Sequence, residues 1–205
     1  MDEVHHIYEK VADEFNRARG RTLFERGFLD AVASRVEPGA EILDLGCGGG
    51  EPIARYFIER GLNVTGVDAS PSLLAMCRRR FPDMSWIEHD MRTLDLGRRF
   101  DAVLAWNSFF HLRKDDQRAM FDVFERHAGP SALLLFTSGP REDEAIGSMF
   151  GHELYHASLG PDEYRRLLAG HGFGVIGHKA EDPDCNGHTV WLARKETGGS
   201  AGDVL

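Results

Sequence analysis

Three glycines in one short motif are the first feature of this sequence that could do chemistry. Gly46, Gly48 and Gly50 directly follow the apolar run 41–45 and directly precede a segment with Pro52 in its first turn. Glycine lets a backbone turn sharply and approach a ligand closely, because no side chain fills the ligand's space. A strand, a glycine turn and a helix in this order are typical of a nucleotide site.

The residues beside the glycines indicate which class of nucleotide ligand the loop would bind. A dinucleotide fingerprint reads GxGxxG, but Glu51 stands where the third glycine would fall. Asp44 precedes the loop. Its carboxylate would repel a pyrophosphate and attract the positively charged amino acid part of a ligand. The loop therefore favours a ligand with a cationic amino acid portion over NAD.

The segment from Asp44 to Gly50 resembles the first motif, D/E-x-G-x-G-x-G, of the class I methyltransferases that use S-adenosyl-L-methionine (SAM). Within that family the chain is similar to the small-molecule enzymes with a methyltransferase type 11/25-like domain. The resemblance covers roughly residues 8–195. It implies a Rossmann-like α/β fold, SAM as cofactor, S-adenosyl-L-homocysteine (SAH) as product and a small-molecule acceptor.

The resemblance also assigns roles at successive strand ends. Asp68 stands where the family's carboxylate accepts hydrogen bonds from both ribose hydroxyls, and Asp90 and Met91 match the pair that binds adenine. Trp106 follows the strand whose end faces the methionine part, and Arg19 matches an arginine that pairs with the methionine carboxylate. The expected cofactor contacts are Asp44, Gly46, Cys47, Gly48, Gly50, Asp68, Ala69, Asp90, Met91, Trp106, Asn107 and Arg19.

Few residues need be catalytic, because the sulfonium of SAM already activates the methyl group and the protein mainly aligns the nucleophile. A base is required only if the attacking atom carries a proton. His111 is the first candidate base and His156 the second. Tyr155 and His156 are expected to face the pocket, and Trp106 or Tyr155 could attract the sulfonium through its ring.

Hydrophobic periodicity predicts the elements that position these residues. Helical spacing over 3–36 indicates an N-terminal helical lid, residues 1–37. Strands then alternate with helices, which predicts a doubly wound sheet of seven strands, mostly parallel, in a domain spanning 38–196. The expected strands are 41–45, 62–67, 84–88, 100–105 and 132–137, and the expected helices are 51–60, 71–80 and 114–127.

The alternation stops after residue 138. We predict an irregular, glycine-rich insertion at 139–160 on the substrate side of the sheet, which would decide the acceptor. A helix at 161–170 and two extended segments, 172–180 and 188–194, follow without a helix between the segments, which predicts a C-terminal antiparallel hairpin. The polar tail 197–205 is expected to be disordered.

The insertion also contains a literal HExxH, from His152 to His156. On a helix this motif would place two imidazoles on one face for zinc, with Glu153 as the base. Gly147 and Gly151 precede the histidine pair, and no obvious third ligand follows. A continuous helix is therefore disfavoured, and we expect no metal.

Composition limits the partners. The 205 residues carry 33 acidic and 24 basic side chains, a formal charge of −9, which disfavours nucleic acid. We expect no membrane association, a cytoplasmic location and a monomer or homodimer. Three cysteines without a CxxC pair indicate neither a disulfide framework nor a cysteine zinc site.

Three other functions stay open at this stage. An NAD-dependent oxidoreductase could use a related fold, although Glu51 and the terminal hairpin count against it. A SAM-binding regulator without turnover would keep Asp44, Asp68 and Asp90 but leave the space above Trp106 closed. A zinc hydrolase would need the HExxH to form a helix.

Overall fold

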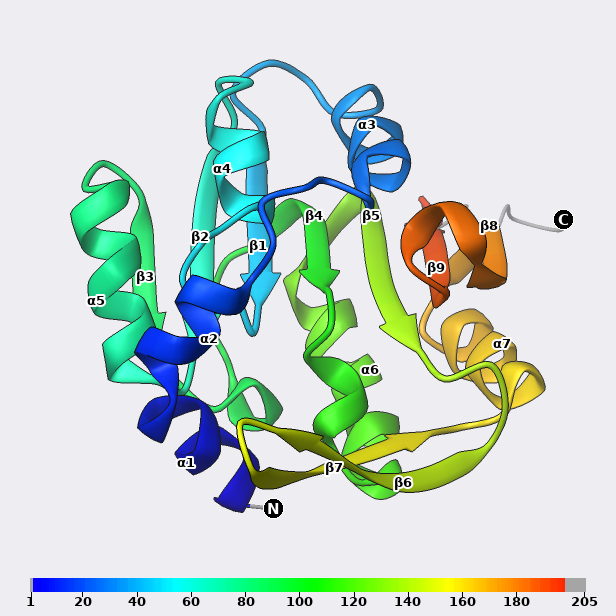
Figure 1. The fold of residues 1–205 in the computed structure, drawn as a ribbon. Helices are drawn as coiled ribbons and strands as arrows, with labels where there is room; N and C mark the ends of the chain where they lie inside the picture. The colour runs from blue at the N-terminus through cyan, green and yellow to red at the C-terminus, as the bar shows by residue number, and fades with distance from the viewer. Residues whose placement is uncertain (1, 198–205) are drawn as a thin grey trace, which may run out of the picture.

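A computed structural model describes residues 2–197 of the chain (Figure 1). The expected disordered tail falls almost entirely outside these residues. The strands are β1 Glu41–Leu45, β2 Asn63–Asp68, β3 Ser85–Glu88, β4 Phe100–Ala105, β5 Ala128–Ser138, β6 Asp143–Met149, β7 His152–Ser158, β8 Phe173–Asp182 and β9 His188–Lys195. The α-helices are α1 Asp2–Lys10, α2 Ala12–Ala18, α3 Arg26–Ala33, α4 Ile53–Ile58, α5 Pro71–Arg80, α6 Lys114–His127 and α7 Pro161–Gly170. Short 3-10 turns are η1 Met91–Thr93, η2 Phe109–His111 and η3 Pro183–Cys185.

The main sheet has seven strands in the order β3-β2-β1-β4-β5-β9-β8. The first five run parallel, whereas β9 pairs antiparallel with both β5 and β8. This confirms the predicted doubly wound sheet with its C-terminal antiparallel hairpin. The order reverses direction at β1, between β2 and β4, which is where ligands bind in such folds.

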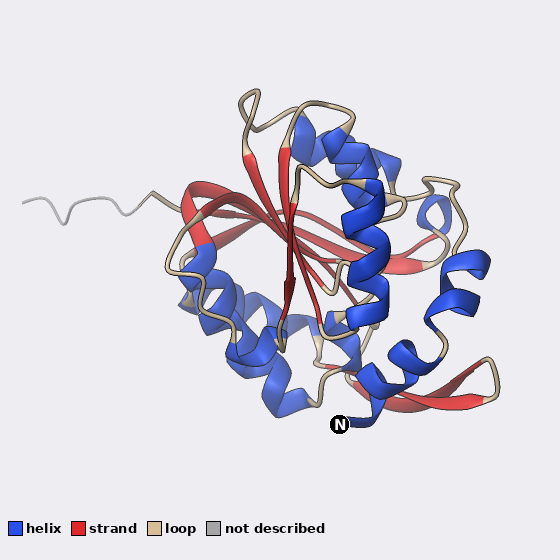
Figure 2. Cartoon of the chain, turned by 90° about the vertical axis from the view of Figure 1, so that its left-hand side faces the viewer, coloured by secondary structure: helices blue, strands red, loops and turns tan. Residues whose placement is uncertain are grey.

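Helices cover the sheet on both faces (Figure 2). One apolar core joins the sheet to α3, α4 and α5, and a second joins it to α6 and α7. Because both faces are covered, the central strands read as continuous apolar runs rather than as an alternation. No helix in the described part of the chain is long and apolar enough to cross a membrane.

The insertion after β5 differs from its prediction. It is not irregular: β6 and β7 pair along their whole length as a separate two-stranded sheet. Phe150 and Gly151 turn the chain with positive φ angles of 50° and 79°. The base of the hairpin is held by the core, since the Gln117 side-chain amide donates to the Ala157 carbonyl at 2.9 Å. The insertion is thus a β-hairpin that lies across the lower end of the sheet in Figure 1.

The segment predicted to be an N-terminal lid, residues 1–37, contains α1, α2 and α3. Helix α1 lies against β7, whereas α3 packs in the core of the sheet and contributes no residue to the lid. Glu9 on α1 accepts hydrogen bonds from the hydroxyls of Ser70 and Ser72 and from the Ser72 backbone N–H. These contacts tie α1 to the start of α5, immediately after β2. The lid and the strand end that carries Asp68 are therefore one connected structure.

Candidate cofactor and acceptor site

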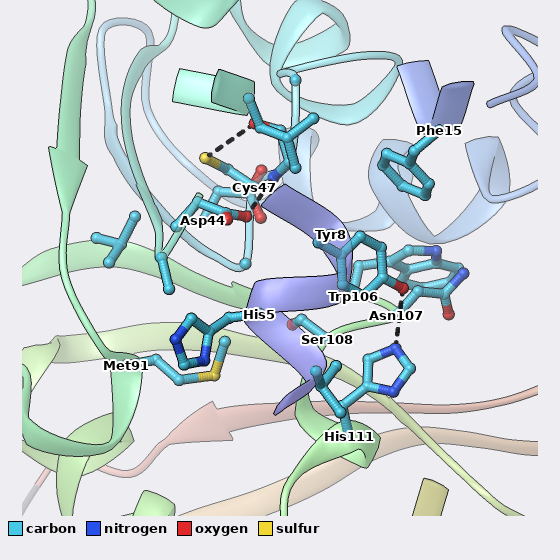
Figure 3. Close-up of a pocket in the computed structure, with 18 of the residues that line it drawn as sticks. His5, Tyr8, Phe15, Asp44, Cys47, Met91, Trp106, Asn107, Ser108 and His111 are labelled. Carbon is cyan, nitrogen blue, oxygen red and sulfur yellow. Dashed lines mark hydrogen bonds between the residues drawn. The ribbon is translucent and has the colours of Figure 1, made fainter. Parts of the chain in front are cut away.

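A cavity of about 320 Å³ lies where the strand order reverses, between the strand ends, helix α1 and strand β7 (Figure 3). It brings together thirteen of the fifteen site residues expected from the sequence. These are Arg19, Asp44, Gly46, Cys47, Gly48, Asp68, Ala69, Asp90, Met91, Trp106, Asn107, His111 and His156. Gly50 and Tyr155 do not line it.

The glycine loop is built by backbone conformation. Gly46 and Gly48 have positive φ angles of 75° and 55°, which side chains rarely tolerate. A Cβ on Gly46 would lie 2.3 Å from the Ser108 Cβ. Gly50 has a different role from the one expected, because a Cβ there would meet Cys77 and Phe81 at 3.2 Å. It allows close packing of the loop on α5, whereas Gly46 and Gly48 line the cavity.

Asp68, at the end of β2, is held from two sides. Its Oδ2 accepts the Gly48 N–H at 2.8 Å, and its Oδ1 accepts the Ser70 N–H at 2.9 Å. Burial raises the pKa of this carboxyl, and the backbone hydrogen bonds oppose the shift. Each oxygen keeps lone-pair capacity for a further donor, as two ligand hydroxyls would require.

Asp44, at the end of β1, is a buried carboxyl with only 4% exposure. Its carboxyl lines the cavity, and no group among the described residues hydrogen-bonds it. Burial, reinforced by the charge of Asp68 and opposed by Arg19, raises its pKa to about 7. An unpaired buried acid is costly and gains most from a cationic ligand group.

Asp90 and Met91 line the cavity from the start of η1. The Arg92 backbone N–H and guanidinium both donate to the Asp90 carboxylate. Burial tends to raise the pKa of Asp90, but the contacts with Arg92 lower it below its usual value. Asp90 is therefore an oriented, ionised acceptor beside the apolar Met91.

Arg19 and Trp106, which the sequence analysis assigned to the methionine part of the ligand, both line the cavity. The Arg19 guanidinium is 3.5 Å from the buried Glu25 carboxylate. Burial raises the pKa of Glu25, with Arg19 opposing the shift. The Trp106 ring lies 6.2 Å from that of Phe28 and 6.0 Å from that of His188. Arg19 is thus held by Glu25, and the Trp106 ring packs between Phe28 of α3 and His188 at the start of β9.

The acceptor side combines η2, α1 and β7. The Tyr8 hydroxyl lies 3.0 Å from His111 Nε2, as the dashed line in Figure 3 marks. His156 reaches the cavity from β7. The expectation that Tyr155 also faces the cavity is corrected, because adjacent residues of a strand point to opposite faces. Tyr155 lies on the face of the hairpin that points away from the cavity. Its partial burial, and to a smaller extent Glu144 on β6, raises the pKa of its phenol.

The HExxH segment lies on β7 rather than on a helix. His152 and His156 are four residues apart, which separates them by about 13 Å along a strand. They cannot share one ion in this arrangement. Within residues 2–197 no group of three or more His, Cys, Asp or Glu side chains is placed to hold a metal.

Several lining residues were not among the fifteen site residues named from the sequence, although Ser108 and Phe110 belong to the segment 107–112 that was expected to reach the transferred methyl group. Ser108, Phe110 and Leu154 belong to the cavity wall, and Glu9 fixes the lid from outside it. Ser108 donates to the Leu45 carbonyl at 2.6 Å. Its neighbour Asn107 has a positive φ of 51°. The Asn-Ser pair after β4 was a turn signal that could have pointed to Ser108, whereas Leu154 depends on the hairpin.

Comparison with known proteins agrees with this geometry. Residues 42–131 match the family model described as a methyltransferase domain. A dTDP-3-amino-3,4,6-trideoxy-alpha-D-glucopyranose N,N-dimethyltransferase of Streptomyces venezuelae is 30% identical over 139 residues, which are 66% of this chain and 57% of that protein. A trans-aconitate 2-methyltransferase of Azoarcus sp. (strain BH72) is 30% identical over 156 residues, 75% of this chain and 55% of that protein. The chain thus spans little more than half the length of these relatives.

A solved structure shares the whole architecture. The Burkholderia thailandensis 1,6-didemethyltoxoflavin-N1-methyltransferase, with bound 1,6-didemethyltoxoflavin and SAH, superposes with a TM-score of 0.74 at 18% identity. The match covers 94% of this chain and 87% of that one. At this identity the likeness shows the fold alone. The chain therefore contains a region, residues 42–131, that matches the methyltransferase domain family, within a fold that it shares with this solved structure.

Proposed function

We propose that this chain is a SAM-dependent methyltransferase that transfers the methyl group to a small-molecule acceptor. The observation that carries the proposal is Asp44, a buried acid without a partner that faces the cavity beside the glycine loop. The ammonium of SAM is the complement that such an acid lacks. Asp68 would take the ribose hydroxyls, Asp90 the adenine amino group, and Arg19 the carboxylate of the methionine part.

SAM supplies a methyl carbon already activated by its sulfonium. The contribution of the chain is then to hold the two reactants in line and to keep water away. Helix α1 and strand β7 lie on the cavity from two sides. Val4, Phe110 and Leu154 add apolar surface there, which supports a small acceptor with an apolar part.

The cavity is lined by Leu154 and His156 of β7 as well as by Trp106. A regulator without turnover needs no wall for a second reactant, so these residues support an enzyme. Sugar and small-acid acceptors appear in the names of the relatives, and we extend to this chain only their common class, a small molecule. A cytoplasmic location and a monomeric or homodimeric state remain part of the proposal.

The test has two steps. SAH should raise the melting temperature of the purified chain, as any ligand specific to the native state does, while NAD and NADP should not. SAM and a panel of small amines, phenols, alcohols and carboxylic acids are then incubated with the chain, and SAH is measured by mass spectrometry. Turnover that disappears in Asp68→Ala supports the proposal. Stabilisation by NAD instead of SAH contradicts it.

A further inference from the structure

The insertion hairpin brings two imidazoles together at the acceptor side of the cavity. His111 comes from η2 and His156 from β7, and their ring centroids are 4.7 Å apart. The ring of Phe110 lies 5.4 Å from that of His156. Both histidines line the cavity. Their hydrogen bonds, however, leave them with different capacities.

Both ring nitrogens of His111 are occupied. Nδ1 is 3.0 Å from the Tyr155 carbonyl oxygen, which can only accept, so Nδ1 carries the proton. Nε2 therefore accepts from the Tyr8 hydroxyl at 3.0 Å. Burial raises the pKa of Tyr8 to about 12, which keeps that hydroxyl protonated. Burial also lowers the pKa of His111 to about 4. His111 has no nitrogen to offer an incoming molecule.

His156 has one nitrogen free. Its Nδ1 lies 3.0 Å from the Leu154 carbonyl oxygen and must donate to it. Nε2 is then the unprotonated nitrogen, and no group among the described residues hydrogen-bonds it. The ring is partly exposed to the cavity, and burial lowers its pKa, so it is neutral at pH 7. The titratable groups that face it are His111 from η2 and, behind His111, Tyr8 from α1.

Gly147 on the neighbouring strand makes room for this ring. A Cβ on Gly147 would lie 2.9 Å from His156 Cε1 and 3.2 Å from Nδ1. The imidazole therefore packs over a position without a side chain, while the Leu154 carbonyl fixes its rotation. Strand pairing, a glycine and a carbonyl together determine where Nε2 points.

We propose that His156, rather than His111, accepts the proton of the methyl acceptor. The inference rests on the proposed function and narrows the acceptor to a nitrogen or oxygen group that carries a proton. That N–H or O–H donates to Nε2. As the new bond to the methyl carbon forms, the carbon–sulfur bond breaks and its electron pair stays on sulfur, and the proton moves to Nε2 and then to solvent. His111 is a positioning residue that links α1 to the hairpin.

The test is nuclear magnetic resonance of the chain labelled with 15N-histidine, saturated with SAH, across pH 5 to 8. Two-bond 1H–15N correlations report which ring nitrogen carries the proton. We expect Nδ1–H and bare Nε2 in both rings, with His156 gaining a proton on Nε2 at a higher pH than His111. Diethyl pyrocarbonate, which acylates bare imidazole nitrogens, should modify His156 ahead of His111.

Gly147→Ala should change the His156 tautomer populations and slow its acylation, with SAH affinity unchanged. Gly160→Ala is the control, because a Cβ there meets only Glu142 at 3.8 Å. Tyr8→Phe should make His111 reactive. An Nε2–H tautomer at His156 would overturn the inference. Protonation of His111 at a higher pH than His156, or faster acylation of His111, would overturn it as well. Failure to bind SAH would instead remove the proposed function, and the histidine spectra could still be interpreted.

Discussion

The two halves of the cavity are built differently. In the cofactor half the backbone shapes the loop: Gly46 and Gly48 have positive φ angles, and backbone N–H groups orient the Asp68 side chain. The acceptor half is made by side chains from α1, η2 and β7, which meet only in the folded chain. A short sequence motif can therefore encode the first half, whereas the second depends on how distant segments pack.

The largest effect should come from adding a side chain to the glycine loop of the cofactor half. Gly46→Ala would place a Cβ 2.3 Å from Ser108 Cβ at a positive φ. We expect SAH affinity to fall by on the order of 100-fold or more, because the loop must move out of its binding conformation. Gly39→Ala has a similar φ of 78° with nothing within 4 Å, so it controls for backbone strain alone. Calorimetry of both variants measures the difference, and equal losses would refute the steric account.

Asp68→Ala should cost roughly 2 to 4 kcal/mol of SAH binding, because two charge-assisted hydrogen bonds are removed. Asp184→Ala, in the hairpin loop between β8 and β9, is the control and should keep full affinity. The measurement is again calorimetric. An Asp68→Ala protein with unchanged affinity would show that the carboxylate does not contact the ligand.

Asp44→Asn should stabilise the free protein while weakening SAH binding. The folded pKa of about 7 lies above the usual Asp value, so ionised Asp44 destabilises the native state above pH 7. The free energy of unfolding of Asp44→Asn should exceed that of the parent protein by on the order of 2 to 4 kcal/mol at pH 8. This difference should shrink as the pH falls from 7 toward 4. Urea unfolding at pH 8 and pH 5 measures it. A variant less stable than the parent at pH 8 would contradict the assigned burial.

The smallest effect concerns the lid. Glu9→Gln keeps an acceptor oxygen but removes the charge, so the partly buried hydrogen bonds from Ser70 and Ser72 should weaken by about 1 kcal/mol. SAH affinity should fall only a few fold, while α1 exchanges its amide hydrogens faster. Asp13→Asn on α2 should leave both readouts unchanged. Unaltered exchange in Glu9→Gln would show that this contact does not hold the lid.

The same contrast explains what the sequence could predict. The doubly wound, mostly parallel sheet with its C-terminal hairpin could be predicted from apolar runs and helical spacing, which the buried core requires. Gly50 was assigned to the cofactor because the motif alone does not separate contact with a ligand from packing on α5. The distinction depends on Cys77 in α5 and Phe81 at the end of α5, which pack against Gly50 in the fold but are distant from it in the sequence.

The hairpin could not be predicted for a different reason. Strand β6 has the sequence DEAIGSM, with charges and a glycine that are weak strand formers, and its outer side chains are exposed. It is a strand because β7 pairs with it and packs on η2 and α1. The alternation of faces that separates Tyr155 from His156 follows from that pairing and not from local sequence.

In the proposed complex, the Asp44 carboxylate meets the cationic end of a SAM-type ligand. The most direct measurement is calorimetric titration of SAH near pH 6.5 in two buffers of different ionisation enthalpy. Asp44 is largely protonated there, and its pKa should drop when the ammonium arrives, so binding should release a proton. Affinity should rise up to about tenfold between pH 6 and pH 8, and Asp44→Asn should abolish both the release and the rise. SAH binding without proton release, equally strong at both pH values, would contradict the account.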